Sequence, residues 1–492
     1  PSYLIDTVRK LFPQLAVEYP QNRSRLEQIE GRQEGARYLA EELREYADGT
    51  LREEERQDFY LMYRAYEADA EGRDRLTAAA FRRYKESGLS RIVARALYGR
   101  QLENSVSRLE TYAACACRHF LQYGLSLQER EEFGFEVSDM GNVYHAVLEN
   151  FAGKLAESGR TWWDFDENFA TQAIKEAVEG YAATYGETVL YSSARNEYAI
   201  TRMSRILTRT VLTLQQHLKQ GSFQPDDYEL SFRFAEDLDS IHVDLSEDEK
   251  MHLQGRIDRI DVSEDAEHVY VKVIDYKSGN TALDLTSVYH GLQLQLIVYL
   301  NAALELEEKN HPGKHAEPAG MFYYHVKDPL VDGKPGDEEE EIERKLLEKL
   351  KVDGLVRAEE KILKDLDREL EAGKKSLVIP AAYNKNGSLS SRSKTASKEQ
   401  FEELCAYVND KIRENGTRIL SGEMEKNPYK LKQRTACDYC SFKEICGFDE
   451  KQEGNSFRRL PTFSDEELWK KMREKGEKED GNEVDTGTAE GH

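Results

Sequence analysis

The chain has 492 residues, with 93 acidic and 69 basic side chains and a formal net charge of -24. That charge argues against a surface that attracts nucleic acid throughout, although it leaves room for a local basic channel. No apolar run approaches the roughly 18 residues that a membrane span needs, and no secretory signal begins the chain, so we expect a cytoplasmic protein without a membrane partner. Because the sequence begins at Pro1, we also expect a fragment or a processed chain.

Residues 1–104 have apolar side chains at helical spacing and no strand-rich stretch, which predicts a helical region at the end of a larger preceding domain. The chain lacks a Gly-x-x-x-x-Gly-Lys-Ser/Thr loop, so we expect no ATP hydrolysis from this fragment. A new helix is predicted to begin at Ser107, with Glu110 at its third position completing a capping box.

Residues 105–450 are predicted to form one domain of the α/β class. Apolar residues recur at helical spacing over 140–155, which places His145 near the edge of a buried helix face. The further elements that we expect are helices over 164–219 and 286–306 and strands over 228–234, 251–262, 269–277 and 319–326. This order predicts a small mixed sheet flanked by helices.

Two charge-rich segments are predicted to lie outside this core. Residues 332–376 are expected to form a surface excursion with one or two helices. Residues 451–492 carry many charges and few apolar side chains, which predicts a disordered tail.

Asp258, Asp275 and Lys277 are the strongest candidates for chemistry. The two-residue period of a strand places Asp275 and Lys277 on one face and Tyr276 on the other. If residues 251–262 and 269–277 form an antiparallel hairpin, Asp258 meets Asp275, and two carboxylates with a backbone carbonyl suit Mg²⁺ or Mn²⁺. The hypothesis is metal-dependent phosphodiester hydrolysis without a covalent intermediate, in which Lys277 orients water or neutralises developing charge.

Other residues could complete this site. His145 could add a metal ligand, with Gly141 one helical turn away, and Gln295 and Tyr299 share a helix face at i and i+4 and could position substrate or water. Each of these residues also has an ordinary structural interpretation. His145 could be a core histidine, and Gln295 could be a hydrogen-bonded glutamine at the edge of a core helix. The aspartates of the hairpin could likewise simply pair with neighbouring cations.

Cysteine spacing predicts a second metal site. Cys115 stands before these residues, and Cys437-x-x-Cys440-x5-Cys446 stands after them, so four thiolates could hold zinc or an iron-sulfur cluster. Spacing alone leaves that choice open. Cys405 lies in a helical pattern and is interpreted as an ordinary buried thiol.

The ordered set Gly141-x-x-x-His145, Gly255-x-x-Asp258, Asp275-x-Lys277 and Gln295-x-x-x-Tyr299 resembles the RecB-like branch of the PD-(D/E)xK nuclease superfamily. The resemblance implies a restriction-endonuclease-like core with helical additions. It also implies that His145, Asp258, Asp275 and the backbone carbonyl of Tyr276 hold the metal and that Lys277 is catalytic. Glu229 matches the acidic residue often found on the first strand of the sheet.

Residues 90–450 further resemble the AddB family of bacterial helicase-nuclease subunits, through Ser105-Val-Ser-Arg-Leu-Glu110, the motifs above, Asn427-Pro-Tyr429 and the cysteines. The resemblance implies a 4Fe-4S cluster on Cys115, Cys437, Cys440 and Cys446 that staples the nuclease domain, preceded by a helicase-like region. It also implies an AddA-type partner in a heterodimer, DNA as substrate, and exonuclease cutting of the 5'-ended strand during double-strand break repair. Cys115-Ala116-Cys117 departs from the family's Cys-Pro-Phe, and Cys117 is expected to face the core.

Two alternatives remain. A stand-alone iron-sulfur exonuclease of the CRISPR-adaptation type shares the cysteine pattern, but it lacks the long helical prefix. A non-catalytic DNA-binding scaffold would be expected to lose Asp258, Asp275 and Lys277, which are present here. Basic residues that could line a DNA channel are Arg256, Arg259, Lys272, Lys385 and Arg392.

Overall fold

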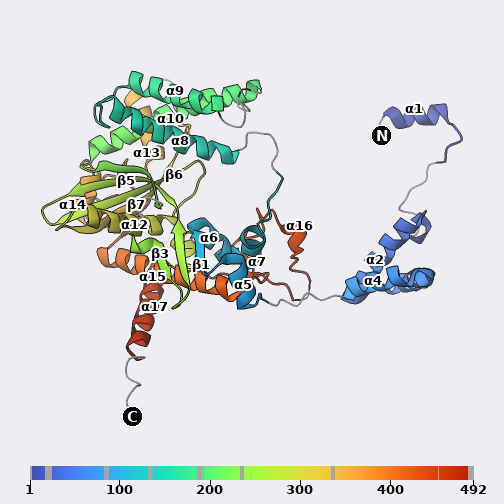
Figure 1. The fold of residues 1–492 in the computed structure, drawn as a ribbon. Helices are drawn as coiled ribbons and strands as arrows, with labels where there is room; N and C mark the ends of the chain where they lie inside the picture. The colour runs from blue at the N-terminus through green and yellow to red at the C-terminus, as the bar shows by residue number, and fades with distance from the viewer. Residues whose placement is uncertain are drawn as a thin grey trace, which may run out of the picture. The chain divides into compact units, whose positions relative to one another are not determined.

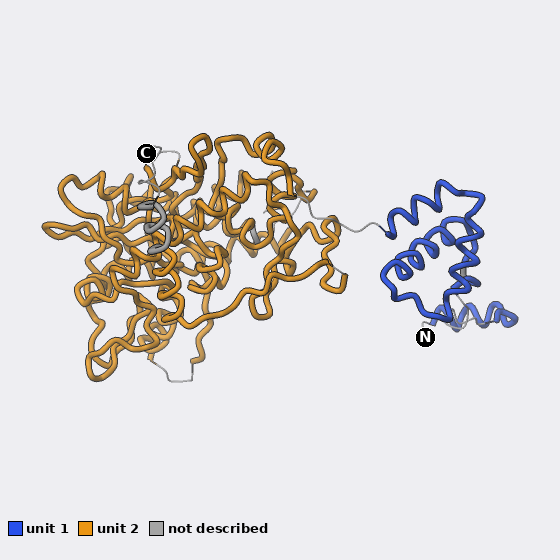
Figure 2. The backbone as a smooth tube through the Cα atoms, turned by 90° about the horizontal axis from the view of Figure 1, so that it is seen from below, with its two compact units in different colours: residues 1–86 blue, residues 87–492 orange. Residues whose placement is uncertain are grey.

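The computed structural model describes residues 3–16, 25–81, 88–130, 137–184, 191, 193–232, 238–333, 338–452 and 454–485. The chain divides into two compact units, residues 1–86 and residues 87–492 (Figure 2). The helices of the first unit are α1 (Tyr3–Leu11), α2 (Arg32–Asp48), α3 (Arg56–Ala65) and α4 (Ala70–Phe81). Leu39, Leu43 and Ala80 form its small core.

The second unit begins before residue 105. Helix α5 (Arg91–Tyr98) and strand β1 (Gln101–Ser105) fall inside the range predicted to be a separate helical region, yet they pack with the second unit. Strand β1 pairs with β4 (Lys250–Gln254), which also pairs with β3 (His242–Asp244). The Leu89 N–H donates to the Gly422 carbonyl over 2.8 Å, which joins this segment to the C-terminal half.

A six-stranded mixed sheet, in the order β2-β5-β6-β7-β8-β9, forms the centre of the second unit. Its strands are β2 (Gln224–Ser231), β5 (Arg256–Glu264), β6 (His268–Lys277), β7 (His315–His325), β8 (Asp353–Arg357) and β9 (Thr395–Ala396). Strands β5 and β6 form the predicted antiparallel hairpin, whereas β6 and β7 are parallel. The mixed α/β architecture predicted from the order of elements is confirmed.

Helices cover both faces of this sheet (Figure 1). On one face lie α8 (Val137–Glu157), α9 (Glu167–Thr184), α10 (Ala194–Gln220) and α14 (Glu360–Leu366). On the other lie α12 (Gln295–Asn310) and α15 (Lys398–Ser421). Strand β6 contributes Val271 to one core and Tyr276 to the other, because alternate side chains of a strand point to opposite faces.

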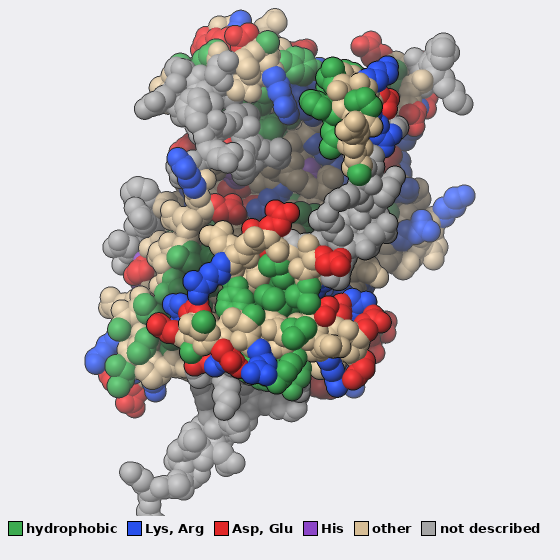
Figure 3. Space-filling view, turned by 90° about the vertical axis from the view of Figure 1, so that its right-hand side faces the viewer, with side chains coloured by type: hydrophobic (Ala, Val, Ile, Leu, Met, Phe, Trp, Pro, Cys, Tyr) green, Lys and Arg blue, Asp and Glu red, His purple; other side chains and the backbone are tan. Residues whose placement is uncertain are grey.

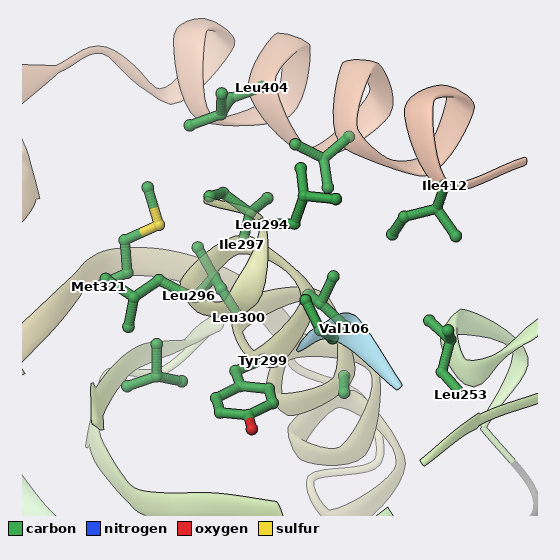
Figure 4. Close-up of a cluster of buried hydrophobic side chains, with 14 of the residues drawn as sticks. Val106, Leu253, Leu294, Leu296, Ile297, Tyr299, Leu300, Met321, Leu404 and Ile412 are labelled. Atoms are coloured by element: carbon green, nitrogen blue, oxygen red, sulfur yellow. The ribbon is translucent and has the colours of Figure 1, made fainter. Parts of the chain in front are cut away.

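The single helix predicted over 286–306 is wrong, because it is two helices. Helix α11 (Leu285–Tyr289) ends before Gly291, whose φ of +76° belongs to the left-handed region, and α12 begins at Gln295. Leu294 and Ile297 lie towards Leu404 of α15, and Tyr299 lies on the other side of α12 (Figure 4).

The cysteine-bearing region combines segments from both ends of the second unit. From the N-terminal side come α6 (Val106–Ala114) and α7 (Ala116–His119), and a π-helical turn follows over Phe120–Gly124. From the C-terminal side come β10 (Tyr429–Leu431), β11 (Arg434–Thr435), α16 (Lys443–Cys446) and β12 (Arg458–Arg459), which we call the C-terminal cysteine module. Strand β10 pairs with both β11 and β12.

Two predictions for the charged segments need correction. Residues 332–376 contain α13 (Glu339–Leu350) and α14, but they also supply β8, which pairs with β7 because Leu355 and Val356 are buried in the sheet. Residues 465–485 form α17 (Asp465–Asp485), which packs on α15 because Leu468, Trp469 and Met472 are buried. The tail's last residues, 486–492, lie outside the described residues.

None of the described helices is both long and apolar enough to cross a membrane.

Candidate functional site

An acidic centre forms where α8, β2 and β5 meet. The Nδ1 atom of His145 lies 3.3 Å from Glu229 Oε1 and 3.3 Å from Asp258 Oδ1. One ligand atom from each residue lies within 4.8 Å of the others, as a shared metal ion requires. Burial disfavours the charged imidazole, but its hydrogen bonds to Asp258 and Glu229 prevail and raise the pKa of His145 to about 10.

Asp275 extends this centre from the neighbouring strand. Its side chain is buried, and the Tyr276 N–H beside it donates to Asp258 Oδ2 over 2.6 Å, so the β5–β6 pairing holds the two carboxylates together. Burial, followed by repulsion from Asp258, raises the pKa of Asp275 well above its ordinary value. Two buried carboxylates at one point call for compensating positive charge.

Lys277 supplies one such charge. Its Nζ lies 2.6 Å from Asp275 Oδ2 and donates to Gln295 Oε1 over 2.9 Å. Gln295 in turn donates through Nε2 to the Tyr299 hydroxyl over 2.9 Å. These contacts place Gln295 and Tyr299 beside Lys277.

The donor set fits a divalent cation. Two carboxylates and one imidazole lie within reach of one ion, and Asp275 adds a third carboxylate from the neighbouring strand. Two of the buried carboxylate oxygens, Glu229 Oε2 and Asp275 Oδ2, accept no hydrogen bond from the described residues, although each faces a cationic side chain. Hard carboxylate oxygens with one imidazole suit Mg²⁺ or Mn²⁺. The carbonyl of Tyr276 stays a predicted ligand, while its side chain packs in the opposite core.

Glu229 reaches the site through an unusual backbone. Its φ of +51° is uncommon for a residue with a side chain, and Arg256 Nε lies 2.6 Å from its Oε2. Neither strand periodicity nor spacing pointed to Glu229, and only the resemblance did. Gly255, beside Arg256, lacks a Cβ where one would meet the Phe232 ring at 2.9 Å.

A cavity of about 1030 Å³ opens beside Lys277 and Gln295. The segment that follows β6 contributes polar groups such as Asn280, Thr281 and Ser287 to the lining of this cavity. The C-terminal cysteine module contributes Tyr429, Leu431, Lys432, Gln433 and Arg434. Lys432 and Arg434 are exposed, and neither pairs with a carboxylate within the described part of the chain.

Two of the basic residues proposed to line a channel are elsewhere, and that prediction is wrong for them. Arg259 and Lys272 are buried and pair with Asp261, through Arg259 Nε to Oδ1 at 2.5 Å and Lys272 Nζ to Oδ2 at 2.7 Å. Arg256 pairs with Glu229, and Lys385 and Arg392 are exposed. On the face displayed in Figure 3, basic side chains are scattered among acidic ones.

The four predicted cysteine ligands line one cavity. Cys115, Cys437, Cys440 and Cys446 surround about 390 Å³, together with Phe442, Phe448 and Phe457. Cys117 is buried and contacts Cys446, but it does not line the cavity. Burial raises the pKa of the Cys115 thiol and, with the neighbouring thiols, raises the pKa of Cys437 to about 11. A bound cation would counter this by favouring the thiolates.

The size of this arrangement bears on the metal. Tetrahedral zinc with four bonds of about 2.3 Å requires its sulfur ligands to lie roughly 4 Å apart. Among the described residues, no three of these thiols have ligand atoms within 4.8 Å of one another, and the cavity that they line leaves room for a group larger than one ion. Cys405 lies apart from these thiols, half-buried against the α12–α15 core.

Comparisons with known proteins agree with this geometry. Residues 103–447 match the PD-(D/E)XK nuclease superfamily. The chain is 39% identical over its whole length to the B subunit of an ATP-dependent helicase/deoxyribonuclease of Lachnoclostridium phytofermentans, covering 42% of that protein. Over 79% of the chain it is 37% identical to proteins of the same name from Thermoanaerobacter sp. and Listeria welshimeri, covering 33% of each. The chain thus spans between 33% and 42% of the length of these curated relatives.

Proposed function

Because the chain belongs to the PD-(D/E)XK nuclease superfamily, we propose that its second unit is the metal-dependent DNA nuclease of an AddAB-type helicase-nuclease. The observation that carries this proposal is the convergence of His145, Glu229, Asp258 and Asp275 beside Lys277. A degenerate nuclease fold would not need to retain a lysine paired with a buried aspartate next to a candidate metal centre.

The metal, Mg²⁺ or Mn²⁺, would polarise the scissile phosphate and lower the pKa of a bound water. His145, Glu229, Asp258 and Asp275 would hold it, with the Tyr276 carbonyl as a further oxygen ligand. Asp258 is oriented for this by the Tyr276 N–H, whose hydrogen bond leaves Oδ1 directed at His145. Because the strands are paired and the carboxylates are buried, little reorganisation is needed when the substrate arrives.

Lys277 would act on the reacting phosphate or its water. The ammonium is held between the carboxylate of Asp275 and the amide oxygen of Gln295, and both contacts limit its freedom. A donor fixed in a partly buried site stabilises negative charge that develops in the transition state. Tyr299 would act indirectly, by orienting the Gln295 amide through the hydrogen bond between them.

The cavity beside Lys277 is the proposed path of the substrate strand. Lys432 and Arg434 would contact phosphates, and Tyr429 offers a half-buried aromatic ring on which a base can stack. In the chain as a whole we propose exonuclease cutting of the 5'-ended strand during double-strand break repair, in a heterodimer with an AddA-type subunit. The names of the relatives, each the B subunit of a helicase/deoxyribonuclease, support this assembly.

We further propose that the four-cysteine cavity holds a 4Fe-4S cluster. Its four thiols come from two segments that are distant in sequence, so a cluster would join both ends of the second unit. Cross-linking distant positions restricts the unfolded ensemble, and the binding energy of the cluster adds to the stability of the fold.

The test is a cleavage assay on the 492-residue chain purified without oxygen. Single-stranded DNA labelled at either end is incubated with Mg²⁺, with and without EDTA, and Asp275→Ala is the matched inactive variant. Metal-dependent cleavage by the wild type and its loss in Asp275→Ala, with the cluster absorbance unchanged, are the expected results. Cleavage equal in both proteins would refute the assignment of this site.

Two outcomes distinguish the alternatives. DNA binding without cleavage, even after an AddA-type subunit has been added, would favour the non-catalytic scaffold. Full activity of residues 87–492 alone, undiminished by the absence of any partner, would favour a stand-alone exonuclease.

A further inference from the structure

Glu110 of α6 contacts the first turn of the helix that carries Gln295. Its Oε1 accepts hydrogen bonds from the Leu294 N–H over 2.6 Å and from the Gln295 N–H over 3.2 Å. The sequence had predicted that Glu110 completes a capping box at the start of its own helix. That prediction is wrong, because Ser105 is the N-cap of α6 and accepts from the Arg108 N–H, which frees the Glu110 side chain.

Helix α12 needs this contact because it has no cap of its own. Its N-cap position is Leu294, which has no side-chain acceptor. The first amide groups of a helix lack partners within the helix, and a carboxylate placed there satisfies them and interacts favourably with the helix dipole. Glu110 therefore supplies, from a residue distant in sequence, the cap that Leu294 cannot provide.

The turn before α12 also packs closely on α6. A Cβ at Gly291 would meet the Ala113 Cβ at 3.2 Å, and the φ of +76° there favours glycine. Two independent contacts, the carboxylate and this close approach, thus fix the start of α12 against α6. Gln295 is the first residue of α12, so the same contacts set the position of the amide that holds Lys277.

The far end of α6 is joined to the segment before the C-terminal cysteines. The helix ends at Ala114, next to Cys115. The Ala116 N–H donates to Asn427 Oδ1 over 2.9 Å, and the Cys117 N–H donates to the Glu425 carbonyl over 3.0 Å. Arg458 of the C-terminal cysteine module hydrogen-bonds the Ala113 carbonyl. Helix α6 therefore contacts the start of α12, which carries the Gln295 amide that holds Lys277, and at its other end it contacts the cysteine site.

We propose that Glu110 is a positioning residue for the nuclease reaction: by capping α12 it sets the Gln295 amide that orients Lys277, and α6 thereby links the order of the cysteine site to that of the catalytic lysine. This inference rests on the proposed function. Glu110 acts as a hydrogen-bond acceptor, not as an acid or base. Because one oxygen accepts both N–H groups, the amide oxygen of glutamine can replace it.

The experiment compares Glu110→Gln with Glu110→Ala in steady-state cleavage of single-stranded DNA by the full chain. Glu110→Gln should keep kcat within about threefold of wild type. Glu110→Ala should lower kcat by roughly 10- to 100-fold with little change in KM, since small misplacements of catalytic groups have effects of that size. Glu103→Ala, an exposed residue on the strand before α6, is the control and should leave both constants unchanged.

A double-mutant cycle distinguishes a loss of positioning from a general loss of stability. In a Gln295→Ala background, Glu110→Ala should cause little further loss, because the link through which it acts is already absent. Additive losses would overturn the proposed route through Gln295. Equal losses in Glu110→Gln and Glu110→Ala would overturn the acceptor role, and unchanged kcat in Glu110→Ala would overturn positioning altogether.

Hydrogen exchange gives a result that is independent of cleavage. Peptides spanning the start of α12 should lose protection in Glu110→Ala and keep it in Glu110→Gln, with cluster absorbance the same in both. Unchanged protection in Glu110→Ala would refute the cap. If the wild type fails to cleave DNA, the proposed function and the positioning role fall together, while exchange still decides whether the cap exists.

Discussion

The Nδ1 atom of His145 lies 3.3 Å from Asp258 Oδ1, although one residue belongs to a helix and the other to a strand on the far side of α9 and α10 in the sequence. The contact joins the helical layer to the sheet at the point where the carboxylates gather. It makes the histidine part of the candidate metal centre, in place of the core histidine that spacing alone also allowed.

His145→Ala should weaken metal binding more than it weakens DNA binding. Removing one ligand of a divalent ion is expected to raise the Mg²⁺ concentration for half-maximal cleavage on the order of 10- to 100-fold. Titration of cleavage against Mg²⁺ measures this. His315→Ala, which removes an exposed histidine outside the site, is the control. An unchanged Mg²⁺ requirement in His145→Ala would contradict the ligand role.

Lys277→Ala should strongly slow cleavage while DNA binding persists. The loss of one positioned donor to a developing negative charge costs about 100- to 1000-fold in kcat. Single-turnover cleavage, with binding measured separately in Ca²⁺, separates the two effects. Lys277→Arg keeps the charge but not the ammonium geometry between Asp275 and Gln295, and should recover only part of the activity. Lys250→Ala, at an exposed surface pair, should behave as wild type.

Replacement of individual cysteines should identify the cluster ligands. Cys437→Ser should remove the visible absorbance of the cluster and lower the melting temperature, because the join between the two ends of the unit is lost. Cys117→Ser and Cys405→Ser should retain both, since neither thiol lines the cavity. Iron and sulfide analysis of each anaerobic preparation checks the result. Zinc without iron in the wild type would contradict the cluster assignment.

Lys432→Gln and Arg434→Gln should raise KM for single-stranded DNA and leave kcat nearly unchanged. Both residues line the cavity beside Lys277 but do not contact the acidic centre, so they would contribute only to strand binding. Each lost phosphate contact should lower the slope of log affinity against log salt by about 0.7. Binding measured over a range of salt concentrations tests this, with Lys250→Gln, at an exposed surface pair, as the control. An unchanged slope would exclude phosphate contact.

Glu307→Gln should make stability less sensitive to pH. Burial, followed by repulsion from Asp226, raises the pKa of Glu307 to about 7. Between the ordinary carboxyl pKa and 7 the folded state binds more protons than the unfolded state, so stability falls as pH rises through that window. The variant has no carboxylate to ionise at this position, so its stability does not fall in this window. Its melting temperature should exceed that of the wild type at pH 8 but not at pH 4.5. Melting curves without added divalent cations test this, with exposed Glu308→Gln as control.

The sequence by itself determined which residue types gather at the candidate site and much of its local geometry. The two-residue period of β6 placed Asp275 and Lys277 together and Tyr276 opposite, and the hairpin considered for the two strand segments brings Asp258 to them. The strand period is a local property of the chain, so it can be read without knowing the fold. The cysteine spacing likewise predicted which thiols gather.

Tertiary structure decided which charged groups face the site and which are buried in the core. Arg259 and Lys272 looked like surface cations, but the folded chain buries both of them beside Asp261. Glu110 looked like a local cap and instead caps α12, and the apolar stripe of α17 ordered a segment that composition predicted to be disordered. In each case the partner is distant in sequence, and whether a charge is solvated or paired depends on surfaces that meet only when the chain has folded.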